Sequence, residues 1–179
     1  MQEVPGIDYE ILIGNGDVIA DWLKEDRIDV GIYVPKNKEH LNVRLLYLDE
    51  FKVIFPKGHD LARYEKVPLT ALKNYPYILH GASWCKELEE ATKKSQQLIP
   101  VRYTTVGATS IVNLVRTGIG VSILPELLLK NDKFKVESRP LDPPLSRKLF
   151  LVTHGTPTMP AVKAFVERLP ALINGGQDI

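Results

Sequence analysis

One stretch of sequence, residues 115–125, which reads VRTGIGVSILP, decides the fold of this chain. A helix that starts at Ala108 or Thr109 and precedes it has apolar side chains spaced for one buried face. Gly118 can adopt the left-handed conformation that ends a helix, and residues 121–124 form an apolar run typical of a buried strand. This order predicts a βαβ unit, which implies parallel strands joined by a right-handed crossover.

The segment before this stretch continues the alternation of strands and helices. Val101–Thr105 is rich in β-branched and aromatic residues and predicts a strand, and Tyr77–Leu79 predicts another that stops at His80. Between these strands, Ser83 can cap a helix that runs to about residue 97.

The two ends of the chain show the same alternation. Ile7–Ile13 predicts a strand, after which Asp17 can cap a helix. Ile28–Tyr33 and the extended segments within Val43–Phe55 predict further strands. At the other end, Lys148–Thr153 predicts a strand, and an apolar stripe follows it on a C-terminal helix that a proline at position 170 is expected to kink or shorten.

The composition excludes several classes of protein. The 179 residues carry a formal net charge of +1 without a run of Lys and Arg, so direct nucleic-acid binding by this chain is not expected. Cys85 is the single cysteine, and four scattered His offer no metal-ligand spacing, so we expect no disulfide, metal or cofactor. The sequence shows neither an export signal nor an apolar run of roughly 18–20 residues, and a cytoplasmic protein with no membrane contact is expected.

Several segments together resemble the effector-binding domain of LysR-type transcriptional regulators, which shares the fold of type 2 periplasmic binding proteins. Residues 115–125 are similar to the family pattern V-x-x-G-x-G-[IV]-x-x-[LV]-P, and residues 53–62 (VIFPKGHDLA) resemble the family's crossing into its second lobe. Ile28–Ile32 is similar to the family's l-D-l-a-i strand, and residues 147–169 resemble its return strand and final helix. These patterns occur in the family's order and cover nearly the whole chain.

The sequence also departs from the family pattern. Asp26 or Arg27 stands where the family usually has Gly, and Asp adopts the left-handed conformation at modest cost. Asp60 stands where Pro is common. The family's opening strand, anion-binding loop and first helix, which precede the position of Pro5, have no counterpart here, and neither do its helix-turn-helix and linker helix. We therefore expect unpaired backbone groups on the strands that would flank the opening strand.

The resemblance implies an α/β fold, namely a two-lobed periplasmic-binding-protein-like (type 2) module with mixed, mostly parallel sheets joined by crossover strands. It implies that residues 1–51 form an incomplete lobe I, that residues 52–140 form lobe II, and that residues 141–179 return to lobe I as a strand and a helix. In this fold a ligand lies between the lobes and is held by backbone N–H groups at helix N-termini and by short hydroxyl side chains. Such sites favour small anions, for example organic or amino acids.

The positions that match the family's binding loops follow strands and precede helices. In lobe I, the resemblance implies that Asn15 is a side-chain donor and Tyr33 an aromatic wall. In lobe II, it implies that the loops around Ser83 and Gly107 supply hydroxyls and backbone N–H groups. The full set of candidate ligand-binding residues is Gly14, Asn15, Tyr33, Val34, Ser83, Trp84, Gly107, Ala108 and Thr109.

Structural roles compete with binding at these positions. Ser83 and Thr109 can equally be N-caps whose hydroxyls are used by their own helices. Gly107 and the glycines of the Gly14-Asn15-Gly16 segment can simply be turn residues. Trp84 can be a packing residue. Both interpretations remain open on the sequence alone.

Catalysis is not expected. His80, Ser83 and Cys85 fall close together in sequence, which suggests a nucleophile with its base. Residues this close around a helix start rarely converge in catalytic geometry, however, and the sequence offers no third group to orient them.

We interpret the chain as the effector-sensing part of a LysR-type regulator that contacts DNA only through a helix-turn-helix domain outside these residues. A homodimer is expected, with interface candidates on the helices near residues 17–26 and residues 83–97 or 108–117. A stand-alone solute-binding protein of a transporter is the alternative. An enzyme on this fold is a third hypothesis and would need an acid/base constellation in the cleft.

Overall fold

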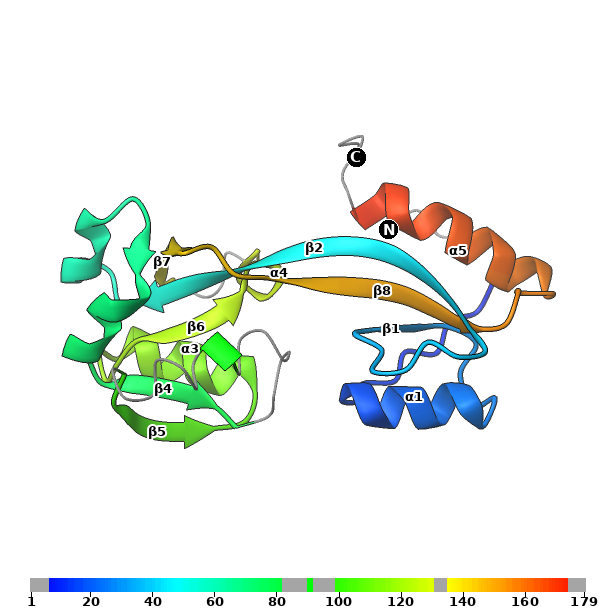
Figure 1. The fold of residues 1–179 in the computed structure, drawn as a ribbon, viewed down its shortest axis with the longest axis horizontal. Coiled ribbons are helices and arrows are strands. Elements are labelled where there is room, and N and C mark those ends of the chain that lie inside the picture. The colour runs from blue at the N-terminus through cyan, green and yellow to red at the C-terminus, as the bar shows by residue number, and fades with distance from the viewer. Residues whose placement is uncertain (1–6, 82–89, 92–98, 131–134, 174–179) are drawn as a thin grey trace. The chain divides into compact units, whose positions relative to one another are not determined.

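Figure 1 shows the computed structural model of the chain, which describes residues 7–81, 90–91, 99–130 and 135–173. The chain divides into two compact units: unit 1 comprises Met1–Leu48 and Lys148–Ile179, and unit 2 comprises Asp49–Arg147. Two long strands, β2 (Leu41–Phe55) and β8 (Ser146–His154), contain residues of both units. The correspondence of unit 1 to lobe I and of unit 2 to lobe II stays a prediction.

Unit 1 is a small sheet with a helix on each face. It contains α1 (Gly16–Lys24), β1 (Gly31–Tyr33) and α5 (Pro160–Ile173), and β1 pairs antiparallel with β8. Val152 of β8 packs with Leu23 of α1, whereas its neighbour Leu151 packs with Leu169 of α5. Because successive strand residues point to opposite faces, α1 and α5 cover opposite faces of the sheet (Figure 1).

Unit 2 is built around the end of β2. On one side β2 pairs antiparallel with β6, and on the other it pairs antiparallel with β7, which continues in parallel to β3. A separate pair of parallel strands, β4 and β5, is connected to this sheet by a bridge between Tyr77 and Val121. The elements are η1 (Asp60–Arg63), β3 (Val67–Pro68), η2 (Leu69–Asn74), β4 (Tyr77–His80), β5 (Val101–Thr105), α3 (Ala108–Arg116), β6 (Ser122–Pro125), α4 (Glu126–Leu129) and β7 (Glu137–Asp142).

The two cores of unit 2 lie on opposite faces of β2. Val53 and Phe55 pack in the larger core, and Ile54 between them packs with the buried face of α3. This alternation follows from the two-residue period of a strand. A strand that is buried on both faces explains the unbroken apolar run at residues 53–55.

The expected α/β fold with mixed sheets is confirmed, but the expected excess of parallel pairing is wrong for the described ladders. The ladders β1–β8, β2–β6 and β2–β7 are antiparallel, and β3–β7 and β4–β5 are parallel. The sequence argument rested on βαβ units, in which neighbouring strands run the same way. The long strand β2 lies instead between two strands that run the opposite way.

The structure corrects two further local predictions. Residues 7–13 are not in a strand. Two of their apolar residues are largely exposed, Ile13 at 92% and Ile11 at 78%, so the run is not buried as a core strand would be. An apolar run becomes a strand only where a neighbour completes its ladder, and here Tyr9 packs instead on the ring of Phe165. Helix α5 continues past Pro170 to Ile173, so the expected shortening is wrong, whereas the expected kink stays a prediction.

Candidate functional site

The carboxyl ends of β4 and β5 form the candidate site of unit 2. These strands are parallel, so both end at the same edge. The Gly81 N–H donates to the Thr105 carbonyl at 2.8 Å, and the Gly107 N–H donates to Nε2 of His80 at 3.2 Å. The loop after β4 and the loop that leads into α3 are therefore held against each other.

The N-cap residue of α3 supplies no side-chain hydrogen bond to the first turn of the helix. Its N-cap is Gly107, with φ 92° and ψ 125°, and this residue offers no side-chain acceptor to the first turn. A Cβ at Gly107 would have room, with Oγ of Ser110 at 4.0 Å, so glycine is favoured by its positive φ. Backbone N–H groups at such an end, together with the helix dipole, favour an anion.

Ala108 and Thr109 are the first two residues of α3, and Thr109 is exposed. Thr109 is therefore not the N-cap of its helix. The competing structural interpretation of its hydroxyl, as an N-cap acceptor, does not apply at this position.

The N-terminus of α1 in unit 1 differs. Oδ1 of Asn15 accepts the N–H groups of Asp17 at 3.1 Å and Val18 at 3.0 Å, so Asn15 is the cap that was expected to be Asp17. Asp17 lies in the first turn and pairs with Lys36 at 2.7 Å. Because its donors already have an acceptor and a carboxylate stands beside them, this end suits an anion less well than α3 does.

The other three unit 1 candidates, Gly14, Tyr33 and Val34, lie next to the N-terminus of α1. A Cβ added at Gly16 would lie 3.7 Å from Cδ2 of Tyr33 and 3.9 Å from the Val34 carbonyl oxygen. Tyr33 is only 5% exposed, packs in the core beneath α1, and has its phenol pKa raised by burial. A Cβ at Gly14 would lie 3.0 Å from the Val18 side chain, so glycine there has a packing role.

Ser83 and Trp84, the remaining candidates, lie outside the described residues, as does Cys85. The sequence argument missed the positioning role of His80, which it considered only as a possible base. The signal for this role was His80 at the end of one strand, together with Gly107 two residues after the end of the next.

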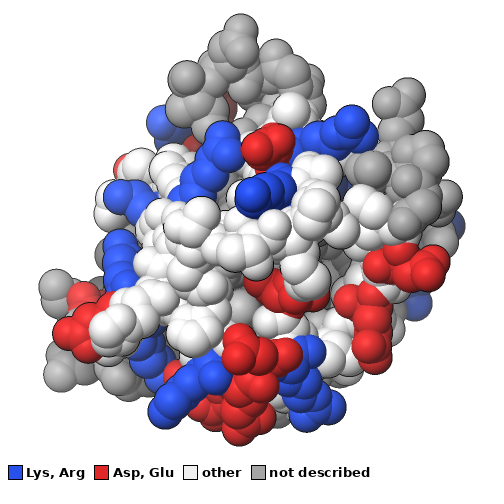
Figure 2. Space-filling view, turned by 90° about the vertical axis from the view of Figure 1, so that its right-hand side faces the viewer, with Lys and Arg blue, Asp and Glu red and all other residues white. Residues whose placement is uncertain are grey.

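The charges, acidic and metal-ligating clusters, and helices of the described residues add three observations. Acidic and basic side chains are intermixed on the face drawn in Figure 2, in keeping with the net charge of +1. In the part of the chain that the structure describes, no three His, Cys, Asp or Glu side chains come together to hold a metal ion. Over the same residues, no helix has both the length and the apolar character needed to cross a membrane.

A model of the LysR substrate binding domain family matches residues 1–172. The chain belongs to this family. Among curated relatives, the probable HTH-type transcriptional regulator LrrA of Synechococcus elongatus is 26% identical over 94% of this chain, and the uncharacterized HTH-type transcriptional regulator YvbU of Bacillus subtilis is 23% identical over 93%. The LysR-type chain described here spans 58% of the length of each relative. The family's domain is regulatory rather than catalytic.

Solved structures show the same fold as this LysR domain. The effector binding domain of QuiR in complex with shikimate superposes with a TM-score of 0.72 at 22% identity, over 93% of this chain and 81% of that one. The CcmR regulatory domain of Synechocystis in complex with 2-PG gives 0.76 at 20% identity, over 94% and 85%. HinK, a LysR family regulator of Pseudomonas aeruginosa, gives 0.79 at 17% identity, over 95% and 61%. The expected type 2 periplasmic-binding-protein-like fold is confirmed.

Proposed function

We propose that this chain is the effector-binding regulatory domain of a LysR-type DNA-binding transcriptional regulator of the cytoplasm, and that its effector is a small anionic metabolite. The N-terminus of α3 carries this proposal, because its N-cap, Gly107, offers no side-chain acceptor to the first-turn N–H groups, and because it lies at the joined ends of β4 and β5. A carboxylate is stabilised there without a counter-charge, which favours organic or amino acids. Since the relatives are named as transcriptional regulators, a transporter's solute-binding protein is the less supported alternative.

Within unit 2, the proposed effector contacts are the backbone N–H groups of Ala108 and Thr109 and the Thr109 hydroxyl. Gly107 leaves space for the ligand because it has no side chain. Ser83 and Trp84 are added from the sequence alone. In unit 1, Gly14, Asn15, Tyr33 and Val34 are proposed as secondary contacts, with Asn15 acting through its side-chain N–H groups because Oδ1 caps α1.

A thermal-shift screen tests the anionic effector. The probes are shikimate, 2-PG and a panel of small carboxylates, each compared with an uncharged analogue of similar size. A ligand at about one hundred times its Kd stabilises the folded state by about 2.7 kcal/mol and raises the melting temperature. If only uncharged analogues raise it, the effector is not an anion.

Ala108→Asp tests the location of the site. A carboxylate in the first turn stabilises α3 through the helix dipole but repels a bound anion. We expect Ala108→Asp to keep its melting temperature and lose the ligand-induced shift. Asn113→Asp, at an exposed position in the same helix, is the matched control and should keep the shift. A full ligand-induced shift in Ala108→Asp would place the site elsewhere.

Thr109→Val tests the hydroxyl. Loss of one hydrogen bond to a charged ligand costs about 1.5–3 kcal/mol, so isothermal titration should show affinity reduced by about tenfold or more. Thr117→Val is the control, because the Thr117 hydroxyl lies at the other end of α3 and donates to the Leu114 carbonyl at 2.8 Å. Equal losses of affinity in the two variants would argue against a direct contact.

We also propose that the domain forms a homodimer through exposed faces of α1 and α3, with DNA bound by a helix-turn-helix domain outside these residues. Asp21 and Lys24 on α1 and Arg116 on α3 are exposed and charged. Such residues at an interface rim affect association and its salt dependence. Sedimentation velocity should show a dimer that Arg116→Glu weakens, and a monomer at high concentration would contradict the proposal.

A further inference from the structure

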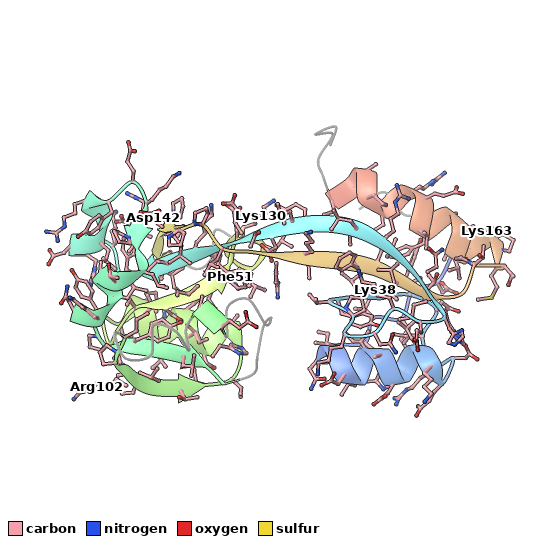
Figure 3. All side chains as sticks on the ribbon, viewed as in Figure 1. Lys38, Phe51, Arg102, Lys130, Asp142 and Lys163 are labelled. Carbon is pink, nitrogen blue, oxygen red and sulfur yellow. The ribbon has the colours of Figure 1, made fainter. Side chains whose placement is uncertain are left out.

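The boundary between the two units crosses both β2 and β8. On β2 it falls between Leu48 and Asp49, and on β8 it falls between Arg147 and Lys148. Phe51, labelled in Figure 3, marks this part of β2, and its N–H donates to the Leu145 carbonyl at 2.8 Å. The residues of unit 2 that stand at these points are therefore Asp49 and Arg147.

These two residues form a buried ion pair. Nε and Nη2 of Arg147 donate to Oδ2 of Asp49 at 3.0 and 2.9 Å. The Asp49 side chain is 0% exposed and that of Arg147 is 11% exposed. A carboxylate in such a position is costly unless its oxygens accept hydrogen bonds, and here both oxygens do.

The second oxygen of Asp49 connects the pair to a third segment of the chain. Oδ1 accepts the N–H of Leu127, in the first turn of α4, at 3.0 Å. Helix α4 directly follows β6, which pairs with β2 from Phe51 onward. The carboxylate of Asp49 therefore connects its own strand, β2, with the neighbouring strand β8 and with the start of α4.

The energetics of buried ion pairs favour a role in positioning over a role in net stability. The cost of desolvating both charges largely offsets their attraction, and apolar residues of similar volume are often as stable. The best-attested benefit of such a pair is that it specifies one register. A slip of one residue between strands turns every side chain to the other face, and it would also separate Arg147 from Asp49.

We propose that Asp49 and Arg147 are positioning residues that fix the register of β2 and β8 where these strands leave unit 2, and that they thereby restrain the motion of unit 1 relative to unit 2. The proposal does not depend on the identity of an effector. A nearby ion pair differs in kind: Lys52 contacts Glu50 at 2.7 Å and Glu126 at 3.6 Å, and these carboxylates are 50% and 40% exposed. Solvent screening weakens such pairs, so Lys52 supplies a control.

The test measures the spread of distances between the units. Spin labels are attached at the exposed positions Lys24→Cys in unit 1 and Lys73→Cys in unit 2, in a chain that also carries Cys85→Ser, and pulsed dipolar spectroscopy records the distance distribution. Arg147→Gln removes the charge and the two-donor geometry but keeps a long polar side chain. We expect its distribution to be about twofold wider than that of the unsubstituted labelled chain, because the few residues where the two strands leave unit 2 are then less restrained.

Two controls separate positioning from simple loss of stability. Lys52→Gln breaks the ion pairs that Lys52 of the same strand makes with two partly exposed carboxylates. Leu72→Ala opens a cavity in the larger core of unit 2 without removing a charge. Both should keep the original width at temperatures well below their melting temperatures. An unchanged width in Arg147→Gln, or equal widening in Leu72→Ala, overturns the proposal.

A further variant covers the case in which Arg147→Gln does not fold. The double variant Asp49→Leu with Arg147→Met replaces both charges by apolar side chains of similar reach, which buried sites often accept without loss of stability. We expect a melting temperature close to that of the original chain together with the wider distribution. A folded double variant with the original narrow distribution overturns the proposal.

Discussion

Gly120 is required by the close approach of another backbone segment. A Cβ at this position would lie 2.4 Å from the carbonyl oxygen of Pro76 and 3.2 Å from its carbonyl carbon. The same carbonyl accepts the Val121 N–H at 2.9 Å, so it cannot move away without losing that bond. We expect Gly120→Ala to lower the free energy of unfolding by about 1–3 kcal/mol or more, as measured by urea denaturation.

Gly118 provides the matched comparison, because it is required for a different reason. Its φ is +80°, nothing lies within 4 Å of a Cβ added there, and it follows the C-cap of α3. Asn tolerates this conformation, so Gly118→Asn should cost much less than Gly120→Asn. Similar losses at the two positions would contradict the steric argument for Gly120.

These residues also show what the sequence can predict at this scale. The left-handed Gly118 followed from its place after a periodic helix, and the positive φ of Asp26, 52°, was expected where the family has glycine. The contact of Gly120 with Pro76 was not predictable, because it joins residues that are distant in sequence. The capping role of Asn15 was missed because Asp17 is an equally good cap by type.

His59 is expected to make stability depend on pH. Burial lowers its pKa below the ordinary 6.5, its Nδ1 accepts the Leu61 N–H at 3.2 Å, and its ring packs on Tyr75 at 4.7 Å. The unfolded chain therefore binds the proton more tightly, and the stabilisation present above pH 6.5 is lost as the pH falls through the lower folded pKa. His59→Asn keeps an N-cap acceptor without titrating, so its free energy of unfolding should fall less between roughly pH 7 and 5. If the free energy of unfolding falls equally with pH in the original chain and in His59→Asn, His59 does not cause the pH dependence.

At the scale of elements, α1 depends on its cap. Asn15 satisfies two N–H groups of the first turn, so Asn15→Ala should cost about 1 kcal/mol of unfolding free energy. Asn15→Asp keeps the acceptor and should cost little. Circular dichroism during urea denaturation measures both, and an Asn15→Asp variant as unstable as Asn15→Ala would show that the cap does not set the stability of this helix.

The success of sequence reasoning at this scale depended on where each element finds its partners. The strands Val101–Thr105 and Tyr77–Leu79 were predicted closely, because turn residues bound them on both sides. The run Ile7–Ile13 has the composition of a strand but no described ladder partner. For the candidate site, the sequence located the loop at Gly107, whereas the contact with His80 required the parallel register of β4 and β5.

At the scale of the whole molecule, the two units differ in how they use the chain. Both cores of unit 2 are built entirely from residues between Asp49 and Arg147. Each core of unit 1 needs both of its segments, since Leu23 and Tyr33 pack with Val152, and Leu46 packs with Leu151 and Leu169. Unit 2 can therefore bury its apolar residues without unit 1, whereas the first 48 residues alone cannot complete either core.

This difference predicts independent folding of unit 2. A polypeptide of residues 49–147 should show cooperative urea unfolding and near-ultraviolet circular dichroism of packed tyrosines, because burial of a complete core is what offsets the loss of chain entropy. A polypeptide of residues 1–48 should show neither signal, and Leu72→Ala in the longer polypeptide should lower its unfolding midpoint, as expected for a residue of an intact core. If the 49–147 polypeptide is unfolded, this prediction is wrong. Unit 2 would then need the parts of β2 and β8 that belong to unit 1 in order to fold.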